Sequence, residues 1–322
     1  MIHARLVLAV TWMTAALAIA PSAHAAEPRL TVGKAKLRAA LKCTDAVRDA
    51  QRTPIMVVTG TGASGDEAYA IGKPAIDRYG APACWVNFPN HTTADMQVSV
   101  QYLVYGLRAM AARAGRPVAV FGISQGGLLP RIALTYWPSL RQHVSDVIAA
   151  AGTQHGTTVG RIGACRTDGC TPAAWQQGAG SNFLKAVNRR GRDGTPGPTA
   201  WTTVRSATDE TVRPTTGPHP TSALKGATNV LIQDVCPGRA VSHIGTALDS
   251  VTFALIEDAI AHRGPAKVSR LPAGVCEHPY APGLDETATA NVISAAGSLT
   301  EGRGESEPKV KREPAVRAWA KR

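Results

Sequence analysis

RPVAVFGISQGGLLP, residues 116–130, contains the turn that decides the fold. An apolar run over residues 116–122 is typical of a buried strand, and the apolar spacing over residues 125–137 predicts a helix. Between them, residues 122–126 complete a G-x-S-x-G pattern. In that pattern a strand turns sharply into a helix, only small flanking residues fit, and the serine hydroxyl is left exposed. The alternative is a glycine-rich turn without a chemical role. Because a strand and a helix stand on the required sides, we favour Ser124 as a nucleophile.

Strands and helices alternate along the rest of the chain. Helical spacing predicts two long helices, over residues 93–114, with Thr93 as a candidate N-cap, and over residues 247–263. Short apolar runs predict five further buried strands, over residues 54–60, 83–89, 145–152, 200–206 and 228–235. This alternation predicts an α/β fold with a mostly parallel central sheet flanked by helices.

The first 25 residues are typical of a secretory signal. Arg5 precedes an apolar run, and Ala23-His24-Ala25 offers small residues for cleavage before Ala26. The apolar run is shorter than the roughly 20 residues that a spanning helix needs. We therefore expect an exported protein with one large domain over residues 26–300. Residues 301–322 hold seven Lys or Arg against four Glu. They predict a basic, disordered tail.

Cysteine content and charge indicate which metals and binding partners to expect. Six cysteines follow the predicted signal, and an even number in an oxidising compartment indicates three disulfides whose pairing the sequence leaves open. Their spacing fits no zinc site, so we expect no metal. The net charge of +12 is spread along the chain, apart from residues 188–192 and the tail. Without a nucleic-acid motif, we expect no nucleic-acid partner. Attraction to an anionic surface is the less favoured alternative.

A serine nucleophile needs a base and an acid that orients the base. In α/β-hydrolases these residues follow in the order Ser, Asp or Glu, His, each in a loop after a strand. Asp209 and His243 stand in such loops, after the strands predicted over residues 200–206 and 228–235. Glu210 is the rival acid. The alternatives are a turn-forming Asp209 and a His243 that only begins a helix.

Two donors are candidates for an oxyanion hole. One is the backbone N–H of Gln125, directly after the nucleophile. The other is Thr61, through its backbone N–H and with its hydroxyl as a further candidate, in the glycine-rich loop of residues 58–65. That loop lacks the Walker lysine and the GxGxxG pattern, so we expect no phosphate or dinucleotide cofactor.

Six motifs occur in the order and approximate spacing of one known family. They are GTG (60–62), PACWVNFP (82–89), SQGG (124–127), AAWQQ (173–177), SATDE (206–210) and VSHIG (241–245). Over about residues 38–280 the chain resembles the Candida antarctica lipase B-like family of α/β-hydrolase lipases. The resemblance implies an α/β-hydrolase fold, esterase or lipase activity and no cofactor. It carries the nucleophile onto Ser124, the acid onto Asp209, the base onto His243, and the oxyanion donors onto Thr61 and Gln125.

The resemblance also implies the disulfides Cys43–Cys84 and Cys236–Cys276. Cys165 and Cys170 have no counterpart in the family, and we expect them to pair locally across a lid-like segment, residues 157–172. The C-terminal cysteine pair of the family is absent, and the helix expected over residues 288–296 is short. Ile123 stands where the yeast lipase has a tryptophan that floors the alcohol pocket. We therefore expect an alcohol pocket that is larger than in the yeast lipase. The alternative is that Ile123 is simply a core residue.

Together these observations predict a secreted serine carboxylic-ester hydrolase of the lipase type that acts through an acyl-enzyme. We expect a monomer, a lipid or small ester as substrate, transient contact with a lipid interface, no cofactor and no metal. The nearest alternatives are a short-chain or polyester esterase and an acyltransferase with the same triad. An exported protease has less support. The alternative from another class is a catalytically silent hydrolase fold that binds lipid.

Overall fold

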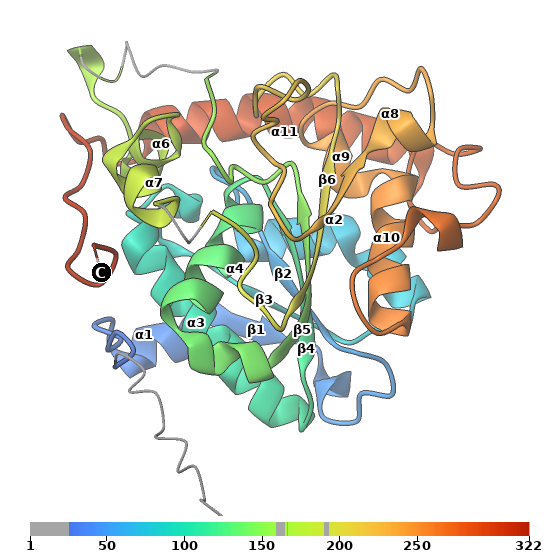
Figure 1. Cartoon of the computed structure of the whole chain (residues 1–322), viewed down its shortest axis with the longest axis horizontal. Helices are drawn as coiled ribbons and strands as arrows, with labels where there is room; N and C mark the ends of the chain where they lie inside the picture. Colours follow the sequence, from blue (N-terminus) through green and yellow to red (C-terminus); the bar gives the residue numbers. More distant parts are fainter. Residues whose placement is uncertain (1–25, 159–164, 166, 190–192, 322) are drawn as a thin grey trace, which may run out of the picture.

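The computed structural model describes residues 26–158, 165, 167–189 and 193–321, and the predicted signal segment lies outside them. In this part of the chain seven strands form one sheet in the order β1-β3-β2-β4-β5-β6-β7 (Figure 1). The β1–β3 pair is antiparallel and the other pairs are parallel. The predicted α/β fold with a mostly parallel sheet is confirmed. The strands are β1 Leu41–Cys43, β2 Ile55–Val58, β3 Ala83–Val86, β4 Val118–Ile123, β5 Val144–Ala150, β6 Ala200–Arg205 and β7 Thr228–Leu231.

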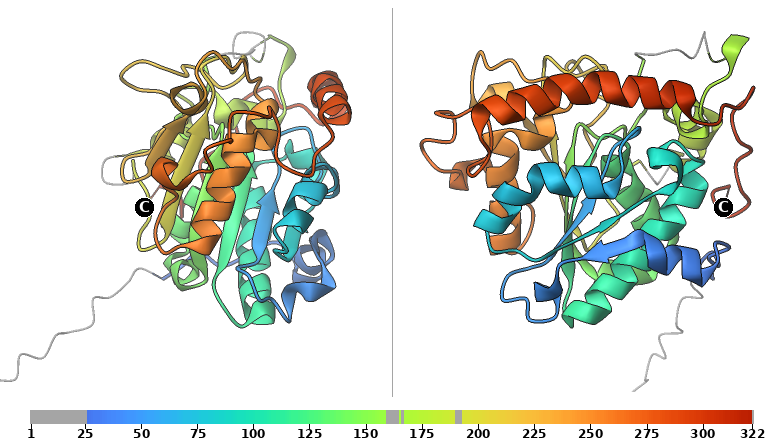
Figure 2. Two further views of the ribbon diagram at one scale, coloured as in Figure 1. Left: turned by 90° about the vertical axis from the view of Figure 1, so that its right-hand side faces the viewer. Right: turned by 180° about the vertical axis from the view of Figure 1, so that it is seen from behind.

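Helices cover both faces of the sheet (Figure 2). The side chains of β2 alternate between the two cores: Met56 and Val58 pack on the side of α3 and α4, whereas Ile55 and Val57 pack on the side of α2 and α10. This is the two-residue period of a strand buried on both faces. The α-helices are α1 Lys34–Ala40, α2 Gly65–Arg78, α3 Met96–Ala114, α4 Gln125–Tyr136, α6 Pro172–Gln177, α7 Asn182–Val187, α8 Ile232–Val235, α9 Gly245–Leu248, α10 Ser250–Ala261 and α11 Glu286–Ser306. The 3-10 helices are η1 Asp45–Val47, η2 Pro89–Thr92, η3 Pro138–Gln142 and η4 Val268–Arg270.

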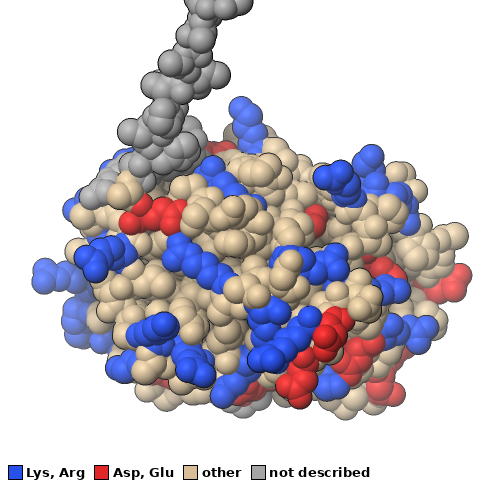
Figure 3. Space-filling view, turned by 90° about the horizontal axis from the view of Figure 1, so that it is seen from below, with Lys and Arg blue, Asp and Glu red and all other residues tan. Residues whose placement is uncertain are grey.

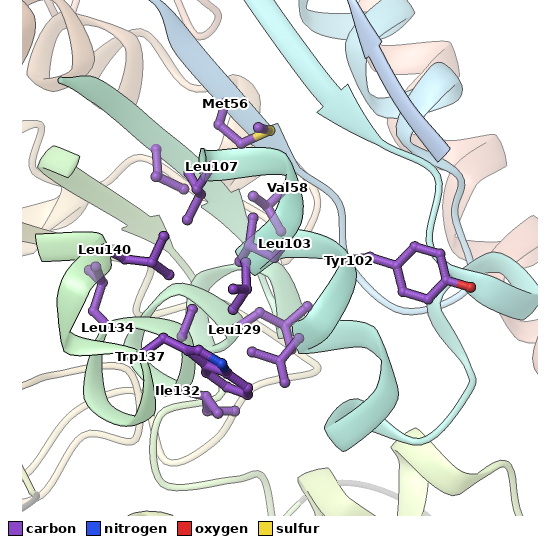
Figure 4. Close-up of a cluster of buried hydrophobic side chains, with 14 of the residues drawn as sticks. Met56, Val58, Tyr102, Leu103, Leu107, Leu129, Ile132, Leu134, Trp137 and Leu140 are labelled. Atoms are coloured by element: carbon purple, nitrogen blue, oxygen red, sulfur yellow. The ribbon is translucent and has the colours of Figure 1, made fainter. Parts of the chain in front are cut away.

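The core on the α3 and α4 side anchors the turn that bears Ser124. Leucines of these two helices and Ile132 lie between the β2 side chains Met56 and Val58 and the indole of Trp137, while the Tyr102 ring points away from the other labelled side chains (Figure 4). Trp137 is fully buried, and its indole N–H donates to the Pro28 carbonyl at 2.7 Å. Because α4 is fixed by this core, the position of its first turn is fixed as well.

Most predicted element boundaries shift by one or a few residues, and three of the differences are described below. The α3 helix begins at Met96, because the Asp95 carboxylate, rather than Thr93, caps it and accepts the Gln97 N–H at 2.9 Å. The last strand ends at Leu231, and residues 232–235 form α8. The helix expected over 247–263 is divided at Asp249, whose carboxylate caps α10 by accepting the Val251 N–H.

The C-terminal helix is longer than expected. The α11 helix runs across the top of the molecule in Figure 1 and extends to Ser306, past the expected residues 288–296. The first residue after it that cannot continue a helix is Pro308, which lacks a backbone N–H. Residues 301–306 therefore belong to this helix rather than to a tail.

The remaining C-terminal segment also differs from the expected disordered tail. The Trp319 ring lies 4.8 Å from the ring of Tyr136, centroid to centroid, and Ala320 is fully buried. The Tyr136 hydroxyl donates to the Ala320 carbonyl at 3.1 Å. The Glu313 carboxylate accepts the first backbone N–H groups of α7. The charge count predicted disorder because it gives no weight to the few apolar positions that the fold buries.

Three disulfides link the elements: Cys43–Cys84, Cys165–Cys170 and Cys236–Cys276. These are the pairs expected from the family resemblance and from local spacing. Cys43 and Cys84 are register partners in β1 and β3. On the face opposite α11, Lys and Arg are spread widely whereas Asp and Glu gather in a few places (Figure 3). No helix in the described residues is long and apolar enough to cross a membrane.

Candidate active site

Ser124 stands on a strained turn between β4 and α4. Its φ is 57° and its ψ is −123°, a conformation that residues with a side chain rarely adopt. The Ser124 N–H donates to the Ala150 carbonyl at 2.9 Å, so β5 holds the turn. A Cβ atom on Gly122 would overlap the Gly126 carbonyl oxygen, and one on Gly126 would overlap the Val58 carbonyl oxygen. The two glycines of the pattern are therefore required for packing.

His243 and Asp209 form a buried pair on the loops that follow β7 and β6. His243 Nδ1 lies 2.9 Å from Asp209 Oδ2, and Asp209 is 1% exposed. The other oxygen, Oδ1, accepts the N–H groups of Thr211 and Val212 at 2.8 Å each. A carboxylate accepts hydrogen bonds, so it places the ring proton on Nδ1 and leaves Nε2 as the basic nitrogen.

Ser124, Asp209 and His243 follow parallel strands at the same edge of the sheet. No hydrogen bond joins the Ser124 hydroxyl to the His243 ring within the described residues. Catalytic hydrogen bonds often tighten only when substrate is bound. The arrangement thus holds a serine, 9% exposed, on a strained turn and a histidine oriented by a buried carboxylate.

Glu210, the rival acid, has a different place. Its Oε2 accepts the backbone N–H of His243 at 2.9 Å, so it holds the base by the main chain and not by the ring. Thr208 acts beside it, since its hydroxyl oxygen accepts the Val241 N–H at 2.8 Å. Sequence reasoning missed both contacts, because the pattern of residues gives no signal for a side chain that binds a distant backbone group.

The loop that bears Thr61 runs against the nucleophile. A Cβ atom on Gly60 would lie 3.1 Å from the Ser124 Cβ, which shows how closely the two turns approach. The Gly62 N–H donates to the His91 carbonyl at 2.8 Å, and the Thr92 hydroxyl donates to the Ala63 carbonyl at 2.8 Å.

Those two contacts come from an unusual backbone segment. Asn90, His91 and Thr92 have φ values of 52°, 44° and 66°, all in the left-handed region. Three such residues in succession are costly, so the surrounding contacts must maintain them. Sequence reasoning gave residues 90–92 no role, although they hold the loop that contains Thr61.

A cavity of about 410 Å³ lies beside the loops of Asp209 and His243. Its walls include Glu210, Ser242, Tyr280 and, from α11, Ile293, whereas Ser124 does not line it. In the same wall, burial raises the pKa of Asp249, while the Val251 N–H and the Arg239 guanidinium oppose that rise. Within the described residues no cluster of His, Cys, Asp or Glu could hold a metal ion.

The structure places Ile123 and part of the lid-like segment. Ile123 is half-buried and packs against the core on the α2 and α10 side. Of the segment 157–172, residues 159–164 and 166 lie outside the described residues, and the Cys165–Cys170 disulfide closes its second half.

Comparison with known proteins finds lipases among the similar chains. No protein-family model matches the chain. In sequence the chain is 29% identical to lipase B of Pseudozyma antarctica over 310 residues, which cover 92% of this chain and 87% of that protein. The crystal structure of Aspergillus fumigatus lipase B superposes with a TM-score of 0.80 at 29% identity, covering 91% of this chain and 73% of that one.

A more distant structure agrees in fold alone. A Bacillus licheniformis lipase, solved in its propeptide form, matches with a TM-score of 0.52 at 18% identity, over 70% of this chain and 54% of that one. The resemblance expected from the six motifs is confirmed, and the chain is homologous to lipase B.

Proposed function

We propose that this homologue of lipase B is a serine carboxylic-ester hydrolase of the lipase type, with Ser124 as nucleophile, His243 as base and Asp209 as orienting acid. The observation that carries the proposal is the 2.9 Å bond between His243 Nδ1 and Asp209 Oδ2, at the sheet edge where Ser124 stands on its strained elbow. Homology to lipase B over 92% of the chain supports the same reaction class.

The reaction runs in two matched halves. The Ser124 oxygen attacks the ester carbonyl while His243 Nε2 takes the hydroxyl proton. The backbone N–H groups of Thr61 and Gln125 stabilise the oxyanion. His243 then gives its proton to the leaving alcohol, which departs as the acyl-enzyme forms. Water repeats the sequence, and the acid is released with Ser124 restored.

The finer assignments are also proposals. We infer a lipid ester of the triacylglycerol type as substrate and a monomer that contacts a lipid interface only transiently. We infer export as well, because three disulfides persist in an oxidising compartment and residues 1–25 have the pattern of a secretory signal. Expression of the full chain with N-terminal sequencing of the exported product checks this, and Ala26 is the expected first residue.

The deciding experiment is hydrolysis of p-nitrophenyl esters from acetate to palmitate, together with a triacylglycerol emulsion. Wild type should turn over, and Ser124→Ala should lose several orders of magnitude in kcat. Ser145→Ala serves as the matched control and should keep full activity. It removes a hydroxyl at the start of β5, whereas the Ser124 turn contacts the end of this strand at Ala150. Equal rates for wild type and Ser124→Ala would contradict the proposal and favour the silent lipid-binding fold.

The same series of ester substrates distinguishes a lipase from a short-chain esterase and from an acyltransferase. An optimum at palmitate together with activity on the emulsion supports a lipase, whereas an optimum at acetate or butyrate supports a short-chain esterase. Ester formation with an added acceptor alcohol, in place of free acid, would identify an acyltransferase.

A further inference from the structure

Gln177, the last residue of α6, has a polar side chain with no role in the proposed reaction. Gln177 ends the AAWQQ motif, is 8% exposed, and reaches the loops that follow β2, β4 and β5. Its Nε2 donates to Thr61 Oγ1 at 2.8 Å and to Gln125 Oε1 at 3.1 Å. Its Oε1 accepts the Thr153 hydroxyl at 3.1 Å. One amide thus connects both candidate oxyanion residues.

The surroundings fix which end of this amide faces the site. Nε2 lies 3.3 Å from the Ala173 carbonyl oxygen, which can only accept, and Oε1 faces a hydroxyl that can donate. A reversed amide would place its oxygen against the acceptor oxygens of Ala173 and Gln125. Gln177 therefore presents its N–H groups to Thr61 and Gln125.

The Thr61 hydroxyl has a single proton, which it already donates in a hydrogen bond to Gln125 Oε1. Thr61 Oγ1 donates to Gln125 Oε1 at 2.7 Å while it accepts from Gln177 Nε2. In this state the hydroxyl proton is not available to a substrate carbonyl. Gln125 Oε1, in contrast, has a second donor in Gln177.

We propose that Gln177 is a positioning residue that allows the Thr61 hydroxyl to turn from Gln125 Oε1 to the oxyanion. When the hydroxyl rotates, Gln125 Oε1 keeps the Gln177 N–H, so a fully buried acceptor is not left without a partner. The N–H that Thr61 Oγ1 accepts also polarises its O–H bond and strengthens it as a donor. The inference rests on the proposed function, because it requires charge to develop on a carbonyl oxygen at this place.

The test is a double-mutant cycle on p-nitrophenyl butyrate. Gln177→Leu keeps the side-chain bulk and removes both N–H donors. It should lower kcat by roughly 10-fold or more and change KM by less than about 3-fold, because the lost interaction acts on the transition state. In Thr61→Val, which has no hydroxyl to turn, Gln177→Leu should lower kcat by less than about 2-fold further.

Gln176→Leu is the matched control for loss of packing and stability. Gln176 is the neighbouring residue of α6 and is fully buried, but its amide binds the Asp95 carboxylate and the Met96 N–H, away from Thr61. It should lower the unfolding midpoint in urea and keep kcat in the folded protein.

The outcomes separate this inference from the function on which it rests. Equal rates for wild type and Ser124→Ala would overturn the proposed function and the inference with it. Three results would overturn the inference alone, provided that wild type is active and Ser124→Ala is not. These are an unchanged kcat in Gln177→Leu, an equal loss in the Thr61→Val background, and an equal loss in Gln176→Leu.

Discussion

Asp146 should make the stability of this protein fall as the pH rises from about 4 to about 6. This residue lies near the start of β5, where its backbone pairs with Ala119 of β4 and Ala200 of β6, and it is only 6% exposed. Burial raises its pKa from 3.8 to about 6, and a bond from Ser145 opposes the rise. Its Oδ1 has no hydrogen-bond partner among the described residues.

The sign and size follow from that shift. A folded-state pKa above the unfolded value means that the folded protein binds the proton more tightly. The contribution to stability is complete below about pH 3.8 and is lost as the pH rises through about 6. The difference between the two pKa values corresponds to about 3 kcal/mol.

Asp146→Asn removes the titrating group and keeps the shape. The free energy of unfolding of the variant, relative to wild type, should therefore increase by about 2.4 kcal/mol between pH 4 and pH 7, because part of the full contribution of about 3 kcal/mol is already lost at pH 4. The assay is urea unfolding at pH 4, 5, 6 and 7, followed by tryptophan fluorescence with the disulfides intact. Asp45→Asn, at a fully exposed carboxylate, is the control for the loss of a negative charge as such. A difference between Asp146→Asn and wild type that stays constant with pH would refute the reasoning.

Three further variants test the candidate active site and the stability of the fold. Asp209→Asn should lower kcat on p-nitrophenyl butyrate on the order of 10⁴-fold with little change in KM, because the amide favours the wrong ring tautomer of His243; a loss confined to KM would contradict this role. Replacing Cys43 and Cys84 together by Ala should lower the free energy of unfolding by about 4 kcal/mol, since the disulfide spans 41 residues; urea unfolding of both proteins measures the loss. Trp319→Ala should lower it by about 2 kcal/mol and leave kcat unchanged, whereas a disordered tail would give no difference in the same unfolding experiment.

Local patterns were the most predictable features of this fold. The strand, the turn at Ser124 and the following helix could be predicted because the apolar run, the G-x-S-x-G pattern and the helical spacing all lie within residues 116–137, although Gly126 is required by the distant Val58 carbonyl. The parallel sheet followed from the alternation of apolar runs and helical spacing. Elements with little apolar content were missed: β1 has only three residues, and α2 is recognisable chiefly by the capping box of Ser64 and Glu67.

The C-terminal segment shows why its composition did not predict an ordered structure. Its charged residues stay at the surface, while Trp319 and Ala320 fill a place that exists only after α3 and α4 have packed. The information for that place lies about 200 residues earlier in the chain, so no window around Trp319 contains it.

Sequence alone also could not decide whether Asp209 or Glu210 contacts the ring of His243. Both are carboxylates on one turn, and strand order alone admits either. The turn decides, because the Thr211 and Val212 N–H groups converge on Asp209 Oδ1 and leave Oδ2 facing His243 Nδ1. Glu210, one residue further, lies on the exposed side of the turn, where its longer side chain reaches the His243 N–H instead. Two adjacent acids thus hold the same histidine at different atoms, one fixing the tautomer of its ring and the other the position of its backbone.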